Sequence, residues 1–292
     1  MSSTAEGSDG TGHRSHSLVR YENPAQGVAR IVLDRPSQRN AQNTQLLYEL
    51  DEMFMKAAQD EDIKVVILTG DGPDFSAGHD LREEDPAIPG RPVATLESDS
   101  GAPGVEGRHA FECEVYLGMC RRWRDLPKPT IAQVHGRAIA GALMLIWPMD
   151  LIIAGDSALF SDPVVAFGLN GGEYFLHGWE VGPRKAKEML FTGEPLSADE
   201  AHRLGMVNHV VPDSELAEFT LDMARRICRM PSYGLRLAKS SVNGALKTQG
   251  QESALDTAFG WHIAGHANNL HRHGSIIDPR GIDMIRDLSK SR

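Results

Sequence analysis

The segment VVILTGDGPDFSAGHDLREED, residues 65–85, leads from an apolar run into a turn made of small residues. The run is rich in β-branched residues and ends at Gly70, which is typical of a buried strand followed by a loop. The small side chains at positions 76–78 would let a ligand approach the main chain closely. The backbone N–H groups of residues 78–80 are candidate unpaired donors, and a helix beginning there would add the positive end of its dipole.

Two strand–helix–strand units are predicted, one leading into this turn and one following it. In the first, residues 27–34 and 63–70 have the pattern of strands. In the second, residues 129–136 and 149–155 predict strands, and residues 140–147 predict a short apolar helix. Crossover connections of this length favour parallel strands in one layered α/β sheet. The helix of the first unit is indicated by apolar residues at helical spacing: Leu46, Leu47, Leu50, Met53, Phe54, Ala57 and Ala58.

The second unit repeats the glycine turn, because Gly141 stands where the turn leads into its apolar helix. N–H donors from the two turns could converge on one oxygen atom, which is what an oxyanion hole requires. The alternative is that both turns only join strands to helices. A phosphate-binding loop is not indicated, since the chain has no GxxxxGK motif.

Charge and composition narrow the possible partners. The chain of 292 residues has a formal charge of -10, which argues against nucleic acid or an anionic membrane surface as a partner. No stretch reaches the roughly 18 uncharged apolar residues that a membrane span needs. Three scattered cysteines, Cys113, Cys120 and Cys228, favour a reducing compartment, so we expect a cytoplasmic protein.

The chain divides into three parts by composition. Residues 1–16 are rich in Ser, Gly and Thr and predict a disordered leader. Residues 17–212 hold both units and should form the core, and residues 213–292 look helical. Between the two units, residues 82–108 are rich in Pro, Gly and acids and lack periodicity, which is typical of either a lid or a disordered segment.

Four collinear motifs resemble the enoyl-CoA hydratase/isomerase, or crotonase, superfamily. They read RIVLDRPSQRNAQNTQLLYEL, VVILTGDGPDFSAGHDL, KPTIAQVHGRAIAGALMLIWPMDLIIAGDSALF and AKEMLFTGEPLSADEAHRLGMVNHVV. The resemblance covers roughly residues 18–211 and implies the α/β fold of that superfamily, a layered β-β-α superhelix with a helical C-terminal subdomain. It implies that residues 213–292 join subunits into a homotrimer or a dimer of trimers. It also implies an acyl-CoA thioester as substrate, with no metal or other cofactor.

The resemblance further implies which residues would bind the thioester. The main-chain N–H groups of His79 and Gly141 would form the oxyanion hole, hold the thioester oxygen and stabilise an enolate at the α-carbon. The CoA moiety would pass the RNA and SAGHD turns and lie near four residues there: Arg39, Ala41, Ala77 and Asp80.

The chain departs from the hydratase pattern at both positions where that pattern has a catalytic glutamate. Met144 and Val164 stand there, and neither can carry a proton. Hydration needs one group to activate water and another to protonate the α-carbon, so a plain hydratase is not favoured. The isomerases of the superfamily that the chain resembles usually keep the second glutamate, so they are disfavoured too. The alternatives are a decarboxylase or hydrolase on the same oxyanion hole, or a catalytically silent acyl-CoA-binding protein. We expect Met144 and Val164 in the wall of an apolar acyl pocket.

Asp162 and Glu173 are the next acid–base candidates, and His177 ranks after them. Asp162 stands two residues before Val164 and could reach the same cleft, although a turn aspartate before Pro163 would look the same. Glu173 lies where the family has a glycine-rich turn and the start of a helix. A carboxylate in that place can also serve only to complement the helix dipole.

His262 and His266 stand four residues apart on a predicted helix. That spacing can place two imidazoles on one metal ion. No third ligand follows at a recognisable spacing, so the sequence favours a polar or interface role for both histidines and predicts no metal site.

Overall fold

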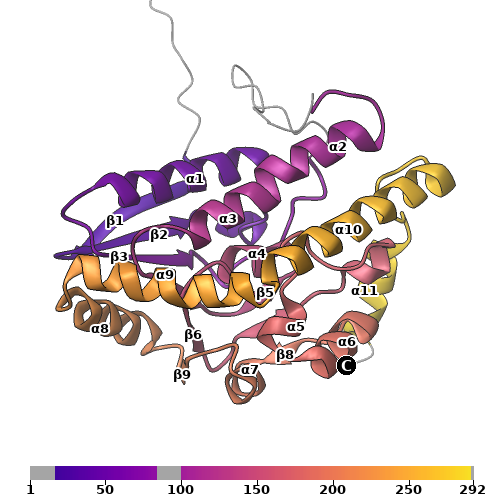
Figure 1. Ribbon diagram of the computed structural model, residues 1–292. Helices are drawn as coiled ribbons and strands as arrows, with labels where there is room; N and C mark the ends of the chain where they lie inside the picture. Colours follow the sequence, from indigo (N-terminus) through magenta and orange to yellow (C-terminus); the bar gives the residue numbers. More distant parts are fainter. Residues whose placement is uncertain (1–16, 84–99, 291–292) are drawn as a thin grey trace, which may run out of the picture.

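A mixed sheet runs through the core of the computed structural model, which describes residues 17–83 and 100–290 (Figure 1). The predicted leader and most of the predicted lid lie outside the described residues. In the described part of the chain, six strands form this sheet in the order β1-β2-β3-β4-β6-β9. Their bounds are β1 Val19–Ala25, β2 Val28–Leu33, β3 Val65–Gly70, β4 Thr130–Val134, β6 Leu151–Gly155 and β9 His209–Val211.

Both predicted crossover units are confirmed. Strands β2 and β3 pair in parallel, from Val28 opposite Val65 to Leu33 opposite Gly70. Helix α1 (Thr44–Gln59) connects them, and the Asn43 side chain caps its first turn by accepting from the Leu46 N–H. Strands β4 and β6 are also parallel, and α4 (Gly141–Ile146) lies between them in the chain. Strand β1 pairs antiparallel with β2 at the sheet edge.

The two faces of this sheet are buried by different helices (Figure 1). Because side chains alternate along a strand, odd and even positions face opposite layers. One set packs in the main core with α1: Ala29, Ile31, Leu33, Val66, Leu68, Ala132 and Val134. The other set packs with α8 (Leu216–Cys228): Val28, Val65, Ile67, Ile131 and Ile153. The near-continuous apolar strands of the sequence are therefore covered on both sides.

A second, smaller sheet holds the two predicted turns together. It consists of β5 (Arg137–Ile139), β7 (Leu159–Ser161) and β8 (Leu196–Ser197) among the described residues. The chain of the first turn runs beside β5, since the Ser76 N–H donates to the Arg137 carbonyl and the Ile139 N–H donates back to the Ser76 carbonyl. Residues 76–79 are thereby brought beside the start of α4.

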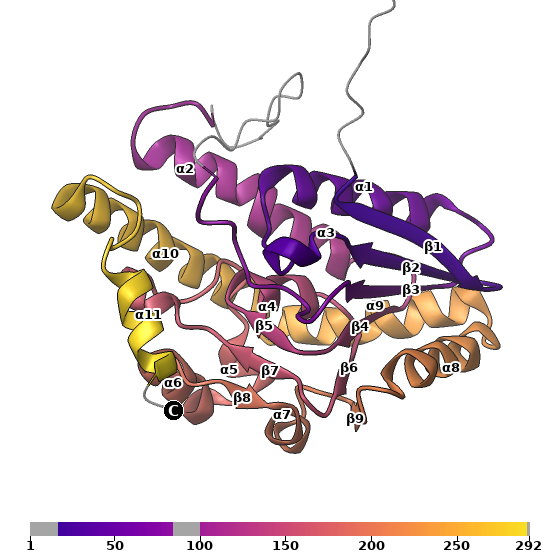
Figure 2. The same ribbon diagram turned by 180° about the vertical axis from the view of Figure 1, so that it is seen from behind.

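The remaining helices surround this core. Figure 2 shows α11 beside the far end of α10 and remote from β1. No helix within residues 17–83 and 100–290 is both long and apolar enough to cross a membrane. The helical region predicted after residue 213 is confirmed by α8 and the last three helices. The helices not yet given are α2 Val105–Glu112, α3 Met119–Arg124, α5 His177–Glu180, α6 Pro183–Thr192, α7 Ala198–Leu204, α9 Ser232–Thr248, α10 Gln251–His273 and α11 Gly281–Lys290. A π-helical stretch at Cys113–Gly118 joins α2 to α3, and short 3-10 helices occupy Pro36–Gln38 and Val164–Phe167.

Candidate active site

A cavity of about 720 Å³ opens where the two turns meet. The first turn contributes Ala77, His79 and Asp80 to its wall, and the second contributes Ala140 and Gly141. The C-terminal segment adds apolar side chains: Ile276, Ile277, Ile282 and Ile285. The sequence analysis assigned this segment only to subunit contacts, so its place in the cavity wall was missed. A single Ile-rich stretch after His273 was the available signal.

The two turns touch each other closely enough that position 78 requires glycine. Gly78 has φ +85°, and a Cβ there would lie 2.6 Å from the Ile139 carbonyl oxygen and 3.2 Å from the Gly141 nitrogen. Both conditions exclude a side chain at this position. The sequence predicts that a small residue at position 78 lets a ligand approach the main chain. In the structure, Gly78 lets the main chains of the two turns approach each other.

Only one of the three N–H donors expected in the first turn is available. The Gly78 N–H donates to the Ser76 hydroxyl, at 3.2 Å, and the Asp80 N–H donates to the Gln42 carbonyl, at 2.9 Å. The His79 N–H has no acceptor among the described residues. No helix begins at this turn, a possibility that the sequence had left open, because residues 79–83 form an extended stretch and a turn.

The second donor is the Gly141 N–H. Gly141 is the first residue of α4, so its N–H has no partner within the helix. Ala140 before it has φ 49° and ψ -110°, a conformation that side chains rarely adopt, and its N–H donates to the Ser161 carbonyl at 2.8 Å. The unusual backbone of Ala140 turns the chain abruptly from β5 into α4.

The His79 imidazole fills the space beside Gly141 and contacts Glu173. A Cβ at Gly141 would lie 2.8 Å from His79 Nε2, and that same nitrogen lies 3.1 Å from Glu173 Oε2. The ring stacks on Tyr116, with 4.3 Å between ring centroids. Burial acts to raise the pKa of Glu173, but the charge and hydrogen bond of His79 outweigh it and hold this pKa well below its usual range. Glu173 is therefore an ionised carboxylate in the cavity wall.

Glu173 does not lie in the first turn of a helix, as one alternative assumed. It stands in a bend four residues before α5 begins at His177. Complementing a helix dipole therefore does not explain this buried carboxylate. Its side chain is 6% exposed and contributes to the cavity wall.

The structure does not bring Asp162 or Met144 to the cavity. Asp162 is fully buried, and it accepts hydrogen bonds from the Val164 and Gly172 N–H groups and pairs with His177 Nε2 at 2.8 Å. This is the turn role that the sequence left open as the alternative. Met144 is 1% exposed and packs in the main core. The expected apolar wall thus includes Val164 but not Met144.

Of the four residues expected along the CoA moiety, two line the cavity and two do not. Ala77 and Asp80 line the cavity. Arg39 and Ala41 do not line it: the Arg39 carbonyl accepts the Ala77 N–H at 2.9 Å, and Ala41 is buried. Asp80 is paired with Arg35 Nη2, at 3.1 Å.

A cluster of buried and half-buried ionisable side chains lies behind Glu173; the sequence pointed to His262 and His266, but Arg108 and Glu112 were not predicted. Arg108 and Glu112 come from α2, and His262 and His266 come from α10. Arg108 and His266 also line the cavity. Their only sequence signal is an i, i+4 spacing on each helix, which does not reveal that the two helices lie side by side.

The comparisons with known proteins agree with this architecture. The family model described as enoyl-CoA hydratase/isomerase matches residues 23–92 and 106–264. A Mycobacterium tuberculosis protein named "Putative enoyl-CoA hydratase EchA13" is 45% identical over 263 residues, which are 87% of this chain and 82% of that protein. The short-chain-enoyl-CoA hydratase of Clostridium acetobutylicum is 33% identical over 236 residues, which are 80% of this chain and 82% of that protein.

A solved structure extends the similarity to the fold. The crystal structure of a probable enoyl-CoA hydratase from Mycobacterium smegmatis has a TM-score of 0.82 and 45% sequence identity to this chain. It covers 90% of this chain and 99% of its own. The predicted layered α/β fold is confirmed, and the chain belongs to the enoyl-CoA hydratase/isomerase family.

Proposed function

We propose that this protein is an enzyme that binds an acyl-CoA thioester in the cavity and stabilises its enolate with the main-chain N–H groups of His79 and Gly141. The observation that carries the proposal is the contact between the two turns, which brings these two free donors to one wall of the cavity. Two preorganised donors aimed at a developing oxyanion lower the barrier to enolate formation. The names of the relatives, enoyl-CoA hydratases, support a thioester of this kind.

The His79 side chain and Glu173 would supply the proton transfer. When His79 is neutral and donates Nε2–H to the ionised Glu173, its Nδ1 carries a lone pair; Nδ1 is buried without a partner among the described residues, so it would have to become exposed to the cavity to reach a substrate. A carboxylate that fixes the tautomer of an imidazole in this way prepares the other nitrogen as a general base. The base would take a proton from the α-carbon while the thioester oxygen becomes the oxyanion.

This assignment replaces the two glutamates of the hydratase pattern. Val164 lines the cavity and Met144 is buried away from it, so neither position can transfer a proton to a substrate there. Isomerisation of an enoyl-CoA needs only one base that moves a proton along the chain, whereas hydration also needs a group to activate water. We therefore favour isomerisation, with hydration, decarboxylation and hydrolysis as the alternatives.

A pair of variants at Gly141 isolates the N–H donor. Gly141→Ala and Gly141→Pro both add a Cβ, which would meet the His79 ring at 2.8 Å, but only proline removes the N–H. Proline is tolerated at the first position of a helix, which is where Gly141 stands. We expect kcat of the proline variant to fall about 100-fold to 1000-fold below that of the alanine variant. Equal kcat values for the two variants would contradict the oxyanion role.

Glu173→Gln and three substrates test the base and the reaction. A 3-enoyl-CoA should gain the conjugated enoyl-thioester absorbance if the protein isomerises it, and crotonyl-CoA should lose that absorbance if the protein hydrates it. Carbon dioxide release from malonyl-CoA would identify a decarboxylase instead. Glu173→Gln should lower kcat by about 100-fold or more if the pair is the acid–base group. Binding of all three thioesters without turnover would leave the silent-binder alternative.

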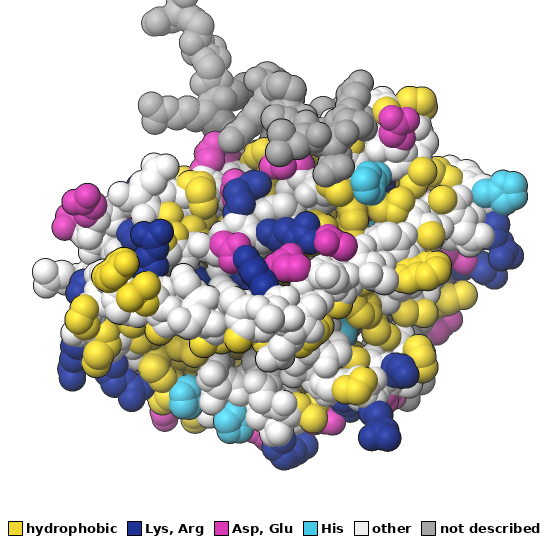
Figure 3. Space-filling model, in the orientation of Figure 1, with side chains coloured by type: hydrophobic (Ala, Val, Ile, Leu, Met, Phe, Trp, Pro, Cys, Tyr) yellow, Lys and Arg dark blue, Asp and Glu magenta, His cyan; other side chains and the backbone are white. Residues whose placement is uncertain are grey.

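We infer that the protein also assembles into homo-oligomers through α9 and α10. Helix α9 has no buried residue in the described chain, although it has the apolar spacing of a packed helix. Tyr233, Leu237 and Val242 on α9 are 69%, 49% and 62% exposed, and Trp261 on α10 is 68% exposed. On the face shown in Figure 3, acidic and basic side chains lie side by side near the middle, with apolar patches around them. Sedimentation of the wild type and of Tyr233→Asp with Val242→Asp would test the inference: the variant should be monomeric.

A further inference from the structure

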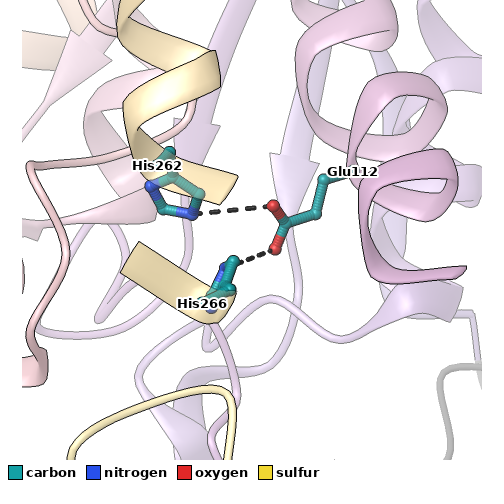
Figure 4. Close-up of side chains that lie close together, drawn as sticks. All are labelled: Glu112, His262 and His266. Atoms are coloured by element: carbon teal, nitrogen blue, oxygen red, sulfur yellow. Dashed lines mark hydrogen bonds and ion pairs between the residues drawn. The ribbon is translucent and has the colours of Figure 1, made fainter. Parts of the chain in front are cut away.

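Glu112, His262 and His266 form a buried cluster between two helices (Figure 4). His266 Nε2 lies 3.1 Å from Glu112 Oε1, and His262 Nε2 lies 3.6 Å from Glu112 Oε2. All three side chains are no more than 2% exposed. The carboxylate and imidazole atoms that could bind an ion lie within 4.8 Å of one another. The third ligand that the sequence spacing did not provide is supplied by α2.

Backbone carbonyls fix which nitrogen of each histidine carries a proton. His262 Nδ1 lies 3.0 Å from the Gly171 carbonyl oxygen, and His266 Nδ1 lies 2.6 Å from the Ile276 carbonyl oxygen. A carbonyl can only accept, so each Nδ1 must be the donor, and each neutral ring then presents the Nε2 lone pair to Glu112. A lone pair that faces a carboxylate is repelled unless a proton or a metal ion lies between the two. Histidines that bind metals commonly have this arrangement, with the other ring N–H held by a carbonyl.

The cluster also lacks positive charge. Glu112 Oε2 and His262 Nε2 are buried and have no hydrogen-bond partner among the described residues. Glu173 Oε1 is 3.6 Å from the same His262 Nε2. In this described cluster, Arg108 is the guanidinium that faces the two carboxylates Glu112 and Glu173, and it pairs with Glu112 Oε1. With neutral imidazoles, that of His79 beside Glu173 included, the cluster therefore has one excess negative charge, and burying such a charge is costly.

We propose that Glu112, His262 and His266 bind a divalent transition-metal ion, with Zn²⁺ as the best fit. Two imidazoles and one carboxylate are ligands that suit Zn²⁺, whereas Mg²⁺ and Ca²⁺ prefer oxygen ligands. Arg108 would keep Glu112 Oε1 while the ion takes Oε2. Because His266 and Arg108 line the cavity, an ion can enter from that side. The ion would hold α2 against α10 behind Glu173, independently of the reaction that occurs in the cavity.

The test measures Zn²⁺ binding to tag-free, chelator-treated protein by calorimetry. His262→Asn and His266→Asn each keep an amide N–H near the position of Nδ1 but lack Nε2. His271→Asn is the control, because His271 is an exposed histidine of the same helix. We expect the wild type and the control to bind one Zn²⁺ per chain with a higher melting temperature, and each cluster variant to bind at least about tenfold more weakly.

Co²⁺ gives a second readout that does not depend on the folding of a variant. Four-coordinate Co²⁺ in the wild type should show intense visible absorption bands, which Zn²⁺ should abolish by displacement. Three results would overturn the proposal. The wild type could release or absorb no heat with Zn²⁺, or it could show only the weak spectrum of hydrated Co²⁺. Both cluster variants could also bind Zn²⁺ as tightly as the wild type. Those results would mean that a proton on an imidazole occupies the place between the carboxylates.

Discussion

Replacing Ala140 by glycine should stabilise the protein, although most substitutions destabilise. Ala140 has φ 49° and ψ -110° at the turn between β5 and α4. Strain of this kind costs about 1–3 kcal/mol, and glycine adopts such a backbone without it. Glycine also increases the entropy of the unfolded chain, which reduces this gain in the free energy of unfolding by about 0.5–1 kcal/mol. The Ala140 methyl group is half-buried, so its loss matters little, and the net gain should be about 0.5–2 kcal/mol.

Ala142→Gly is the matched control, two residues further on. Ala142 is fully buried inside α4, so glycine there loses about 1 kcal/mol of helix propensity and about 0.8 kcal/mol of methyl burial. The assay is urea unfolding at one protein concentration, with the midpoint and slope of each variant compared with those of the wild type. The two substitutions should shift the midpoint in opposite directions. A destabilised Ala140→Gly variant would refute the assignment of backbone strain to this turn.

Two further predictions follow from glycine and carboxylate positions. Gly78→Ala should lower the free energy of unfolding by at least about 1 kcal/mol more than Gly205→Ala, as measured by urea unfolding. Both glycines have positive φ, but only the Cβ at position 78 would meet backbone atoms. Equal losses of stability would contradict the tight contact between the two turns. Burial raises the pKa of the half-buried Glu180 to about 7, so the folded state binds more protons than the unfolded state between about pH 4.5 and 7. The free energy of unfolding should therefore fall by about 1–3 kcal/mol as pH rises through this window. Glu180→Gln should abolish that decline. Unfolding measured at several pH values tests both expectations.

The sequence predicts the layers of this fold well because its signals there are local. Strands β2 and β3 are continuous apolar runs, and α1 has one apolar face, so each element can be assigned from its own residues. The crossover length then requires the two strands to be parallel. A helix does not form after Gly78, for a tertiary reason. The Asp80 N–H donates to the Gln42 carbonyl, and this contact with the first unit holds the segment extended.

The site was harder to predict because its ionisable groups depend on packing between distant segments. Asp162 has the right spacing to reach the cleft, yet three hydrogen bonds turn it into the interior. Glu173 meets His79 across 94 positions of the chain, and Glu112 meets His266 across 154. The periodicity of residues within one helix or strand does not predict such contacts between distant segments. The glycines indicated where free N–H donors could lie but not which groups they are: of the three candidates in the first turn, only the His79 N–H has no acceptor among the described residues.

Under the proposed function, this difference would explain how the chain could keep an oxyanion hole while changing its acid–base groups. The two turns approach each other closely at Gly78, Ala140 and Gly141, since a Cβ on Gly78 would lie 3.2 Å from the Gly141 nitrogen and 3.5 Å from the Ala140 Cβ. Proton transfer needs only a carboxylate or imidazole that reaches the same cavity, and such a side chain can come from several elements around it. Val164 and the buried Met144 cannot transfer a proton, so the proposed function assigns that role to His79 and Glu173, which both line the cavity. A Gly141→Pro variant should therefore lose turnover whichever reaction occurs, whereas the effect of Glu173→Gln should depend on the substrate.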